Sequence, residues 1–348
     1  FNKVVFRDRF SPQAQHLLLD GTGKFGTLEG YPAGPAGHMH ADVNTLINFT
    51  DQERMWLVDH TYADRSIEDH SGLYITRDGQ VSYRVHEARL RLAAQSERSA
   101  VTTTVFEGFS GATWERSLFW QRGRRFLIID RVLAQEPGDY RVRCSFRALG
   151  EARLARPALR LTQGEKACAI ISDGRARLDL EDYALPGGQD FATAYTYAAP
   201  VVRVFRQDKT AHLESGESMG FANLLQAGPT EGSLLGTTLQ PLSEAAALVE
   251  DPEGMVVCGV GALPGDKGDA GAFIVSGTEA LLGSLRRLGG SAAPALAAAA
   301  PVTLYWRHGG EVRVEAATPT QLTVGGAAVP LHIDAGNHAL PAEVARIV

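Results

Sequence analysis

The chain has 348 residues, of which 44% are hydrophobic and 21% are charged, as expected for a globular protein with a large core. Forty acidic residues against 34 basic ones give a formal net charge of -6, which argues against a surface for nucleic acid or for an anionic membrane. Because no apolar run approaches the length of a bilayer-spanning helix, we predict no membrane segment.

Short strands followed by turn signals dominate the first two thirds of the chain. Segments that alternate in polarity, or that are rich in β-branched and aromatic residues, run over 4–10, 55–60, 72–76, 81–85, 113–121, 126–134, 139–146, 167–172 and 176–182. Asp78-Gly79 and Asp173-Gly174 suit two-residue hairpin turns, because glycine tolerates a positive φ. This spacing predicts an all-β fold, an antiparallel β-supersandwich.

The C-terminal part of the sequence shows a different pattern from the strand-rich first two thirds. Leu281, Leu282, Leu285 and Leu288 follow helical spacing and precede two glycines, so we expect one helix over 278–290. The alanine-rich segment 291–301 is predicted to be a linker or a packed connector, and small strands follow it. We therefore place a boundary near residue 290, with a sandwich domain over 1–290 and a linker plus small C-terminal β subdomain over 291–348.

The three cysteines, Cys144, Cys168 and Cys258, lie far apart in apolar stretches. We predict buried free thiols rather than a disulfide framework or a thiolate metal site. Arg116 and Asp130 lie in adjacent predicted strands, and we expect them to form a structural ion pair.

A cluster of potential metal ligands lies in the segment GHMHADVNTLINF, residues 37–49. In an extended strand, His38, His40 and Asp42 would point to one face. Neutral imidazoles and carboxylates suit zinc and similar metals. Two metal-site patterns with HxH fit poorly: a cupin-like barrel wants a glutamate where Asn44 or Thr45 stands, and the HxHxDH hydrolase pattern wants a histidine at Val43.

A third pattern fits better. The segments GHMHADVNTLINF, MWLVDHTYAD (55–64) and DHSGLYITRDGQ (69–80) resemble the sandwich domain of the heparinase II/III-like polysaccharide lyases. Residues 4–21 resemble the strand pair that introduces this domain, and 112–132 resemble its arginine-containing strand and the strand that follows. The resemblance covers about residues 1–240, and the first 80 residues carry its most specific part.

The resemblance implies roles for individual residues. His38 matches a catalytic histidine that faces the sugar. His40, Asp59 and His70 match the three ligands of a mainly structural zinc ion, although another divalent metal is an alternative. Asp42 would orient a neighbouring histidine or hold the loop. His60 and His86 remain alternative ligands, because Ser71 stands where the family often has asparagine after the third ligand.

The resemblance also implies an activity. Such lyases cleave acidic, uronate-containing glycans by β-elimination, and the remaining catalytic groups come from an α/α toroid domain that precedes the sandwich. We therefore expect an acidic polysaccharide or oligosaccharide as substrate, an upstream toroid domain or chain as partner, and a periplasmic or secreted location. A non-catalytic, metal-stiffened carbohydrate-binding β-domain and a metal-dependent hydrolase remain alternatives.

Overall fold

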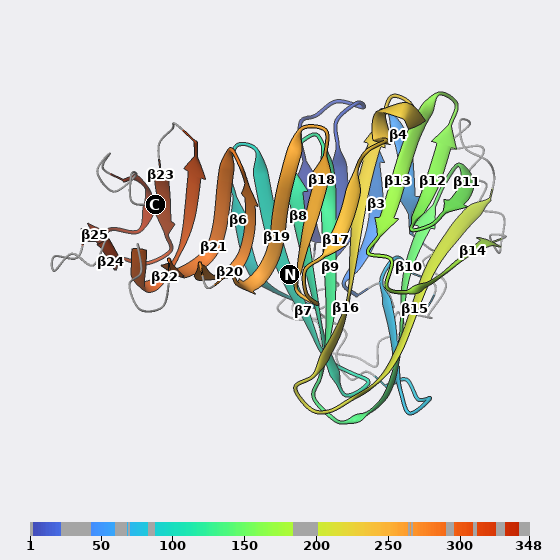
Figure 1. Ribbon diagram of the computed structural model, residues 1–348, viewed down its shortest axis with the longest axis horizontal. Helices are drawn as coiled ribbons and strands as arrows, with labels where there is room; N and C mark the ends of the chain where they lie inside the picture. The colour runs from blue at the N-terminus through green and yellow to red at the C-terminus, as the bar shows by residue number, and fades with distance from the viewer. Residues whose placement is uncertain are drawn as a thin grey trace, which may run out of the picture. The chain divides into compact units, whose positions relative to one another are not determined.

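The computed structural model describes residues 3–21, 43–59, 68, 70–82, 88–183, 201–263, 265, 267–289, 296–308, 312–324 and 331–340 (Figure 1). These residues form three antiparallel sheets, and a 3-10 turn, η2, covers Glu231–Leu234. The prediction of an all-β, antiparallel fold is confirmed. Within the same residues we find no helix with the length and hydrophobicity that crossing a bilayer would require.

The first sheet has eight strands in the order β1-β2-β3-β4-β10-β15-β14, and β5 pairs with β10. Their bounds are β1 Lys3–Arg7, β2 His16–Asp20, β3 Thr45–Asp51, β4 Arg54–Val58, β5 Leu73–Arg77, β10 Gly138–Ala148, β14 Arg177–Tyr183 and β15 Val202–Leu213. Strands that are distant in sequence therefore become neighbours, since β10 contacts β4, β5 and β15.

The second sheet also has eight strands, in the order β11-β12-β13-β16-β9-β8-β7-β6. Their bounds are β6 Arg89–Gln95, β7 Ser99–Phe109, β8 Ala112–Gln121, β9 Arg125–Ala134, β11 Glu151–Ala155, β12 Ala158–Gln163, β13 Lys166–Ser172 and β16 Ser218–Gly228. The strands β8, β9 and β16 lie in the middle of this sheet and are almost continuously buried.

The third sheet has ten strands in the order β17-β18-β19-β20-β21-β22-β23-β26, and β24 pairs with β22 and β25. Their bounds are β17 Thr238–Pro241, β18 Ala246–Asp251, β19 Gly254–Ala262, β20 Gly268–Ser276, β21 Glu279–Leu288, β22 Leu296–Arg307, β23 Val312–Ala316, β24 Thr320–Val324, β25 Leu331–Ile333 and β26 Gly336–Ala339.

The chain divides into two compact units. The first comprises 1–90, 104–116 and 122–235, and the second comprises 91–103, 117–121 and 236–348. The predicted boundary near 290 stays a prediction. In the structure, the last change from the first unit to the second comes after Leu235. Residues 291–295 lie between β21 and β22, and these two strands pair with one another.

In the first unit, the first and second sheets pack face to face around an aromatic core. Phe126 of β9 contacts Phe6 of β1 and Phe49 of β3 edge to face, with ring centroids 5.4 and 5.8 Å apart. The tryptophans of this unit, Trp56 and Trp114, are fully buried. Cys144 and Cys168 are also buried and free, as is Cys258 in the second unit, so the cysteine prediction is confirmed. Burial raises the pKa of the Cys144 and Cys168 thiols well above the usual value, which keeps them protonated.

The helix expected over 278–290 is wrong, because this segment forms β21. The register of β21 shifts between Leu282 and Leu285, where Ser284 takes a positive φ of 53°. Such a bulge adds one residue to the two-residue repeat of a strand. It therefore turns Leu282 and Leu285 into the same core cluster, and the three-residue spacing imitates a helical face. Residues 296–301, expected as linker, belong to β22.

One of the two expected hairpin turns is confirmed. Asp78 and Gly79 have φ values of 51° and 75°, and a bridge joins Arg77 to Gln80 around them. Asp173-Gly174 is not a hairpin turn, which corrects the prediction. It connects β13 in the second sheet to β14 in the first, since β13 pairs with β12 and β16 while β14 pairs with β15.

Candidate functional site

The structure brings together two of the residues to which the sequence analysis assigned a metal-binding role. Asp59 follows the last residue of β4, and His70 lies three residues before β5. The Nδ1–H of His70 donates a hydrogen bond to Oδ1 of Asp59 over 2.8 Å. The side chains of His70 and Asp59 are only 4% and 12% exposed. The pair is therefore held at the edge of the protein interior.

The backbone that carries His70 is fixed by its neighbours. Ser71 is fully buried. Its hydroxyl accepts a hydrogen bond from the backbone N–H of Arg147 at 3.0 Å, and its carbonyl accepts one from the N–H of Leu46 at 2.9 Å. Gly72 allows this close approach, because a Cβ there would lie 2.8 Å from Cγ2 of Thr45 and 3.1 Å from the ring of Trp114. The segment that presents His70 is thus part of the packed core.

A buried arginine links this segment to the end of the histidine motif. Arg116 and Asp130 are both 0% exposed and form a two-point ion pair, with Nε to Oδ1 at 2.8 Å and Nη2 to Oδ2 at 2.9 Å. The Nη1 of Arg116 donates to the carbonyls of Asn44 at 2.8 Å and Ser71 at 3.2 Å. One guanidinium therefore joins the chain just after Asp42 to the chain just after His70. The expectation of a structural pair is confirmed.

Asp59 and His70 are the two predicted ligands that the structure describes, and the distance between them is close to the distance that a metal ion requires. Two ligand atoms of one tetrahedral zinc ion lie roughly 3.3 Å apart when each bond is about 2.0 Å long, and the two atoms of Asp59 and His70 are 2.8 Å apart. To admit the ion, the pair would open by about 0.5 Å and the Nδ1 of His70 would lose the proton that it donates to Asp59. Among the residues that the structure describes, no group of three or more potential ligands is present, so a complete set requires a residue outside them.

The other predicted site residues lie outside the described residues. They are His38, the predicted catalytic residue; His40, the predicted first ligand; Asp42; and the alternative ligands His60 and His86. Their roles stay predictions. The described chain resumes at Val43 and Asn44, which are two residues beyond Asp42 at most.

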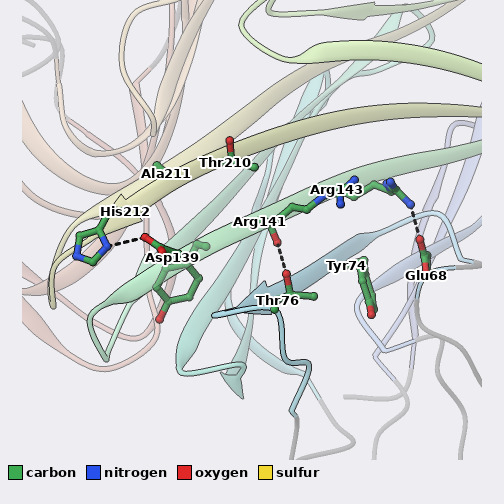
Figure 2. A pocket seen from close by; sticks show the side chains of 11 residues that line it. Glu68, Tyr74, Thr76, Asp139, Arg141, Arg143, Thr210, Ala211 and His212 are labelled. Atoms are coloured by element: carbon green, nitrogen blue, oxygen red, sulfur yellow. Dashed lines mark hydrogen bonds and ion pairs between the residues drawn. The ribbon is translucent and has the colours of Figure 1, made fainter.

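A polar groove of about 640 Å³ lies on the outer face of the first sheet, over β5, β10 and β15 (Figure 2). It begins at Glu68, in the segment that leads to His70, and ends at His212 near the end of β15. Cross-strand pairing explains its lining, because Arg143 lies opposite Tyr74 on one side and Asp208 on the other, and Arg141 lies between Thr76 and Thr210. We call it the β5–β10–β15 groove.

Strand alternation decides which side chains face this groove. In β10, Asp139, Arg141 and Arg143 are exposed or half-buried, whereas Tyr140, Val142 and Cys144 between them are buried. Side chains of a strand point alternately to the two faces of the sheet. The same sequence DYRVRC therefore supplies both the core of the sandwich and the charged floor of the groove.

The two arginines of the groove are held differently. Arg143 is 17% exposed and forms ion pairs with Asp208 at 3.0 Å and with Glu68. Arg141 is 58% exposed and reaches the same Asp208 only at 3.4 Å. Surface pairs of this kind contribute little to stability. The guanidinium of Arg141 is therefore the cation that a ligand in the groove could engage at little cost.

His212 adds a second cation at the end of the groove. Its Nδ1–H donates to Oδ1 of Asp139 over 2.7 Å, as Figure 2 shows. This hydrogen bond, with the negative charges of Asp139 and Glu214, raises the pKa of His212 above its usual value. The imidazolium is therefore favoured at mildly acidic pH, where it is paired with the carboxylates of Asp139 and Glu214.

The sequence analysis did not single out this groove. None of its lining side chains was predicted to belong to a functional site. The available signal was the alternation of charged and apolar residues in DYRVRC and in the end of β15. That alternation identifies an outer face but not which strands lie beside one another.

Comparisons with known proteins concern the fold. No family model matches the sequence, and no curated protein matches it. Among solved structures, the chain is similar to a heparinase III, with a TM-score of 0.53 and 12% identity over 79% of this chain and 41% of that one. A heparinase III gene product gives a TM-score of 0.51 and 14% identity over 72% of this chain and 39% of that one.

A third similar structure is the heparan sulfate lyase HepC from Pedobacter heparinus. It has a TM-score of 0.50 and 13% identity, over 97% of this chain and 42% of that one. The chain thus spans about two fifths of the length of these proteins. These structural similarities establish a shared fold over most of the chain, as the sequence resemblance predicted. Because the identities are so low, they establish the fold alone.

Proposed function

We propose that this chain is the sandwich domain of a polysaccharide lyase that cleaves an acidic, uronate-containing glycan by β-elimination. The observation that carries the proposal is the likeness of its fold to heparinase III and heparan sulfate lyase structures over 72–97% of its length. The contact between Asp59 and His70 supports it, because these two residues match two ligands of the motif on which the resemblance rests.

The chemistry assigns distinct tasks to the residues of this chain. In β-elimination a base removes the proton beside the uronate carboxylate, the carboxylate is neutralised, and an acid protonates the leaving oxygen. His38 is proposed to face the sugar and transfer a proton, a task suited to imidazole near neutral pH. Arg141 is proposed to bind a charged substituent of the glycan in the β5–β10–β15 groove. The remaining groups are proposed to come from an upstream α/α toroid domain or chain.

A zinc ion is proposed to be held by His40, Asp59 and His70. Bound there, it would supply stability to the segments that flank the site rather than reaction chemistry. Arg116 holds the backbone on both sides of these residues, after Asp42 and after His70, so the metal and the ion pair would fix the same two segments. A periplasmic or secreted location is part of the same proposal, since that is where such glycans are met.

Turnover is tested with the full gene product and a panel of heparan sulfate, alginate, chondroitin and hyaluronan. Unsaturated uronate products, detected by their ultraviolet absorbance, are expected with at least one glycan. Saturated products would instead support the metal-dependent hydrolase, and glycan binding without any product would support the non-catalytic carbohydrate-binding domain. Either result contradicts the lyase proposal.

The metal assignment is tested separately from turnover, by metal content and thermal unfolding. His40→Ala and His70→Ala are expected to lose the metal and to unfold at lower temperature, because the binding free energy of a structural metal adds to the stability of the fold. His38→Ala should retain both properties and lose turnover. His332→Ala, which changes a 64% exposed histidine, is the control. Loss of metal in His38→Ala equal to that in His40→Ala would contradict this division of roles.

A further inference from the structure

A second groove lies on the first unit, at the end of the first sheet where β1 leads into β2. It has a volume of about 420 Å³. Its lining includes the side chains Arg7, Arg9, Phe10, His16, Arg54 and Met55. None of these residues belongs to the β5–β10–β15 groove or to the Asp59–His70 pair. We call it the Arg7–Phe10 groove.

The register of four strands creates the floor of this groove. Arg7 at the end of β1 pairs with His16 of β2, His16 pairs with Thr50 of β3, and Thr50 pairs with Met55 of β4. Residues paired directly across antiparallel strands lie side by side on one face. The neighbouring residues Phe6, Leu17 and Phe49 point to the other face and are buried. The floor is therefore fixed by the packing of the core beneath it.

The loop that covers one side of the groove is anchored at both ends. The N–H of Asp8 donates to the carbonyl of Gln15 at 3.1 Å, and the N–H of Ala14 donates to the carbonyl of Ser11 at 3.0 Å. Gln15 is buried, and its side-chain amide donates to Asp51 at 2.9 Å. The geometry of the loop between β1 and β2 is thus set by contacts with the core and with the turn between β3 and β4.

This anchored loop presents an aromatic ring to solvent. Phe10 is 93% exposed, although a phenylalanine side chain gains about 1.5–3 kcal/mol when it is buried. The guanidinium carbon of Arg7 lies 5.0 Å from the centre of the ring, so a cation sits against one side of it. An exposed ring of this kind offers its flat face to the apolar face of a sugar ring.

In the described part of the chain, the two cations beside this ring form no ion pair, although Glu53 also lines the groove. Arg7 and Arg9 are both exposed, and among the described residues no carboxylate lies within ion-pair distance of either one. Burial and the positive charge of Arg7 lower the pKa of His16, and the carboxylate of Glu53 in the lining accepts a hydrogen bond from Gln13. Guanidinium groups bind sulfate and carboxylate groups with strong, charge-assisted hydrogen bonds.

We propose that the Arg7–Phe10 groove binds an acidic sugar unit, with its sulfate or carboxylate on Arg7 and Arg9 and its ring on Phe10. The ligand class rests on the proposed function, because an exposed ring beside two arginines would also suit a single-stranded nucleic acid. The formal net charge of -6 does not separate the two ligands, because it repels a sulfated glycan and a nucleic acid alike. The groove is thus a second glycan contact, separate from the β5–β10–β15 groove.

The proposal is tested by calorimetric titration of the full chain with a sulfated hexasaccharide prepared from heparan sulfate, at low and at physiological salt. Arg7→Ala/Arg9→Ala is expected to weaken binding about tenfold, and to reduce the dependence of binding on salt. Phe10→Ala is expected to weaken binding about fivefold, whereas Phe10→Trp should preserve it. The control Arg286→Ala/Arg307→Ala removes the same charge from two exposed residues of the second unit and should bind as the parent chain does.

Further probes identify the ligand. An uncharged hexasaccharide of glucose should bind at least tenfold more weakly than the sulfated one. A single-stranded oligonucleotide of equal charge should also bind more weakly, and equal affinity that depends on Arg7, Arg9 and Phe10 would overturn the assignment to a sugar. Unchanged hexasaccharide binding in both groove variants, with their folding verified by thermal unfolding, would overturn the site itself.

The outcome is independent of catalysis. A chain that forms no unsaturated product, but that loses hexasaccharide binding in Arg7→Ala/Arg9→Ala, contradicts the lyase proposal and supports this groove. A chain that cleaves glycans, and whose groove variants bind the hexasaccharide as the parent does, supports the lyase proposal and contradicts the proposed binding in this groove.

Discussion

The buried arginine beneath the candidate site and the exposed arginines on its surface show that the same residue type serves two different purposes. Arg116 is 0% exposed and contacts Asp130 and two carbonyls. Arg141 is 58% exposed and reaches a carboxylate only at 3.4 Å. A fully paired, buried guanidinium positions the backbone and cannot be given up to a ligand, whereas a loosely paired, exposed one can exchange water or a weak ion pair for a ligand anion.

Breaking the buried pair is expected to have the largest effect. Arg116→Met leaves Asp130 as an unpaired buried carboxylate, so we expect the free energy of unfolding to fall by about 3–5 kcal/mol. Chemical denaturation measures it. The double variant Arg116→Met/Asp130→Leu should recover part of this loss, because no buried charge remains.

The same double variant separates positioning from stability. In it the carbonyls of Asn44 and Ser71 still lack the donor that Arg116 provides, so metal affinity and turnover should remain reduced although the fold is restored. Recovery of metal binding together with stability would contradict a positioning role for Arg116.

A second buried carboxyl, that of Asp51, extends the comparison, because it forms no ion pair with any residue that the structure describes. Asp51 is 3% exposed, and burial raises its pKa from 3.8 to about 6, opposed by hydrogen bonds from Gln15 and Gln52. The folded protein therefore holds a proton that the unfolded chain releases between about pH 4 and pH 6. Over that window the stability falls as pH rises, and above it this contribution is constant.

Asp51→Asn removes this titration. Since one pKa unit corresponds to about 1.4 kcal/mol, the variant should gain roughly 2–3 kcal/mol over the parent near pH 7 and much less near pH 4. Denaturation curves at the two pH values measure the difference. Glu151→Gln, which changes an exposed carboxyl of β11, is the control. An equal effect of Asp51→Asn at both pH values would show that the carboxyl ionises normally.

The smallest effect on stability is expected on the surface. Arg141→Ala should change the free energy of unfolding by less than about 0.5 kcal/mol, while weakening the binding of an acidic hexasaccharide about fivefold. Calorimetry and thermal unfolding measure the two quantities. Arg286→Ala removes one exposed arginine of the second unit and should affect neither. Loss of stability without loss of binding in Arg141→Ala would make this residue structural.

Much of the first unit could be predicted from local pattern. The alternation in DYRVRC and the Asp78-Gly79 turn act over a few residues, and the structure follows both. Leu282 and Leu285 misled the same reasoning, because the bulge at Ser284 gives a strand the spacing of a helix. Nothing within 278–290 reveals that bulge, since it depends on the strands to which β21 pairs.

The candidate site likewise has features that the sequence determined and features that only the tertiary structure decided. The sequence by itself determined which residue types could hold a metal, and the order of the strands that carry Asp59 and His70. Only the tertiary structure brought those two side chains to 2.8 Å and connected their segment through Arg116 to Asn44. It alone assembled the β5–β10–β15 and Arg7–Phe10 grooves, whose residues come from strands separated by up to about 140 residues in the chain. Alternation is a property of one strand, whereas a groove is a property of the strands that pair, and pairing is decided by the packing of the whole core.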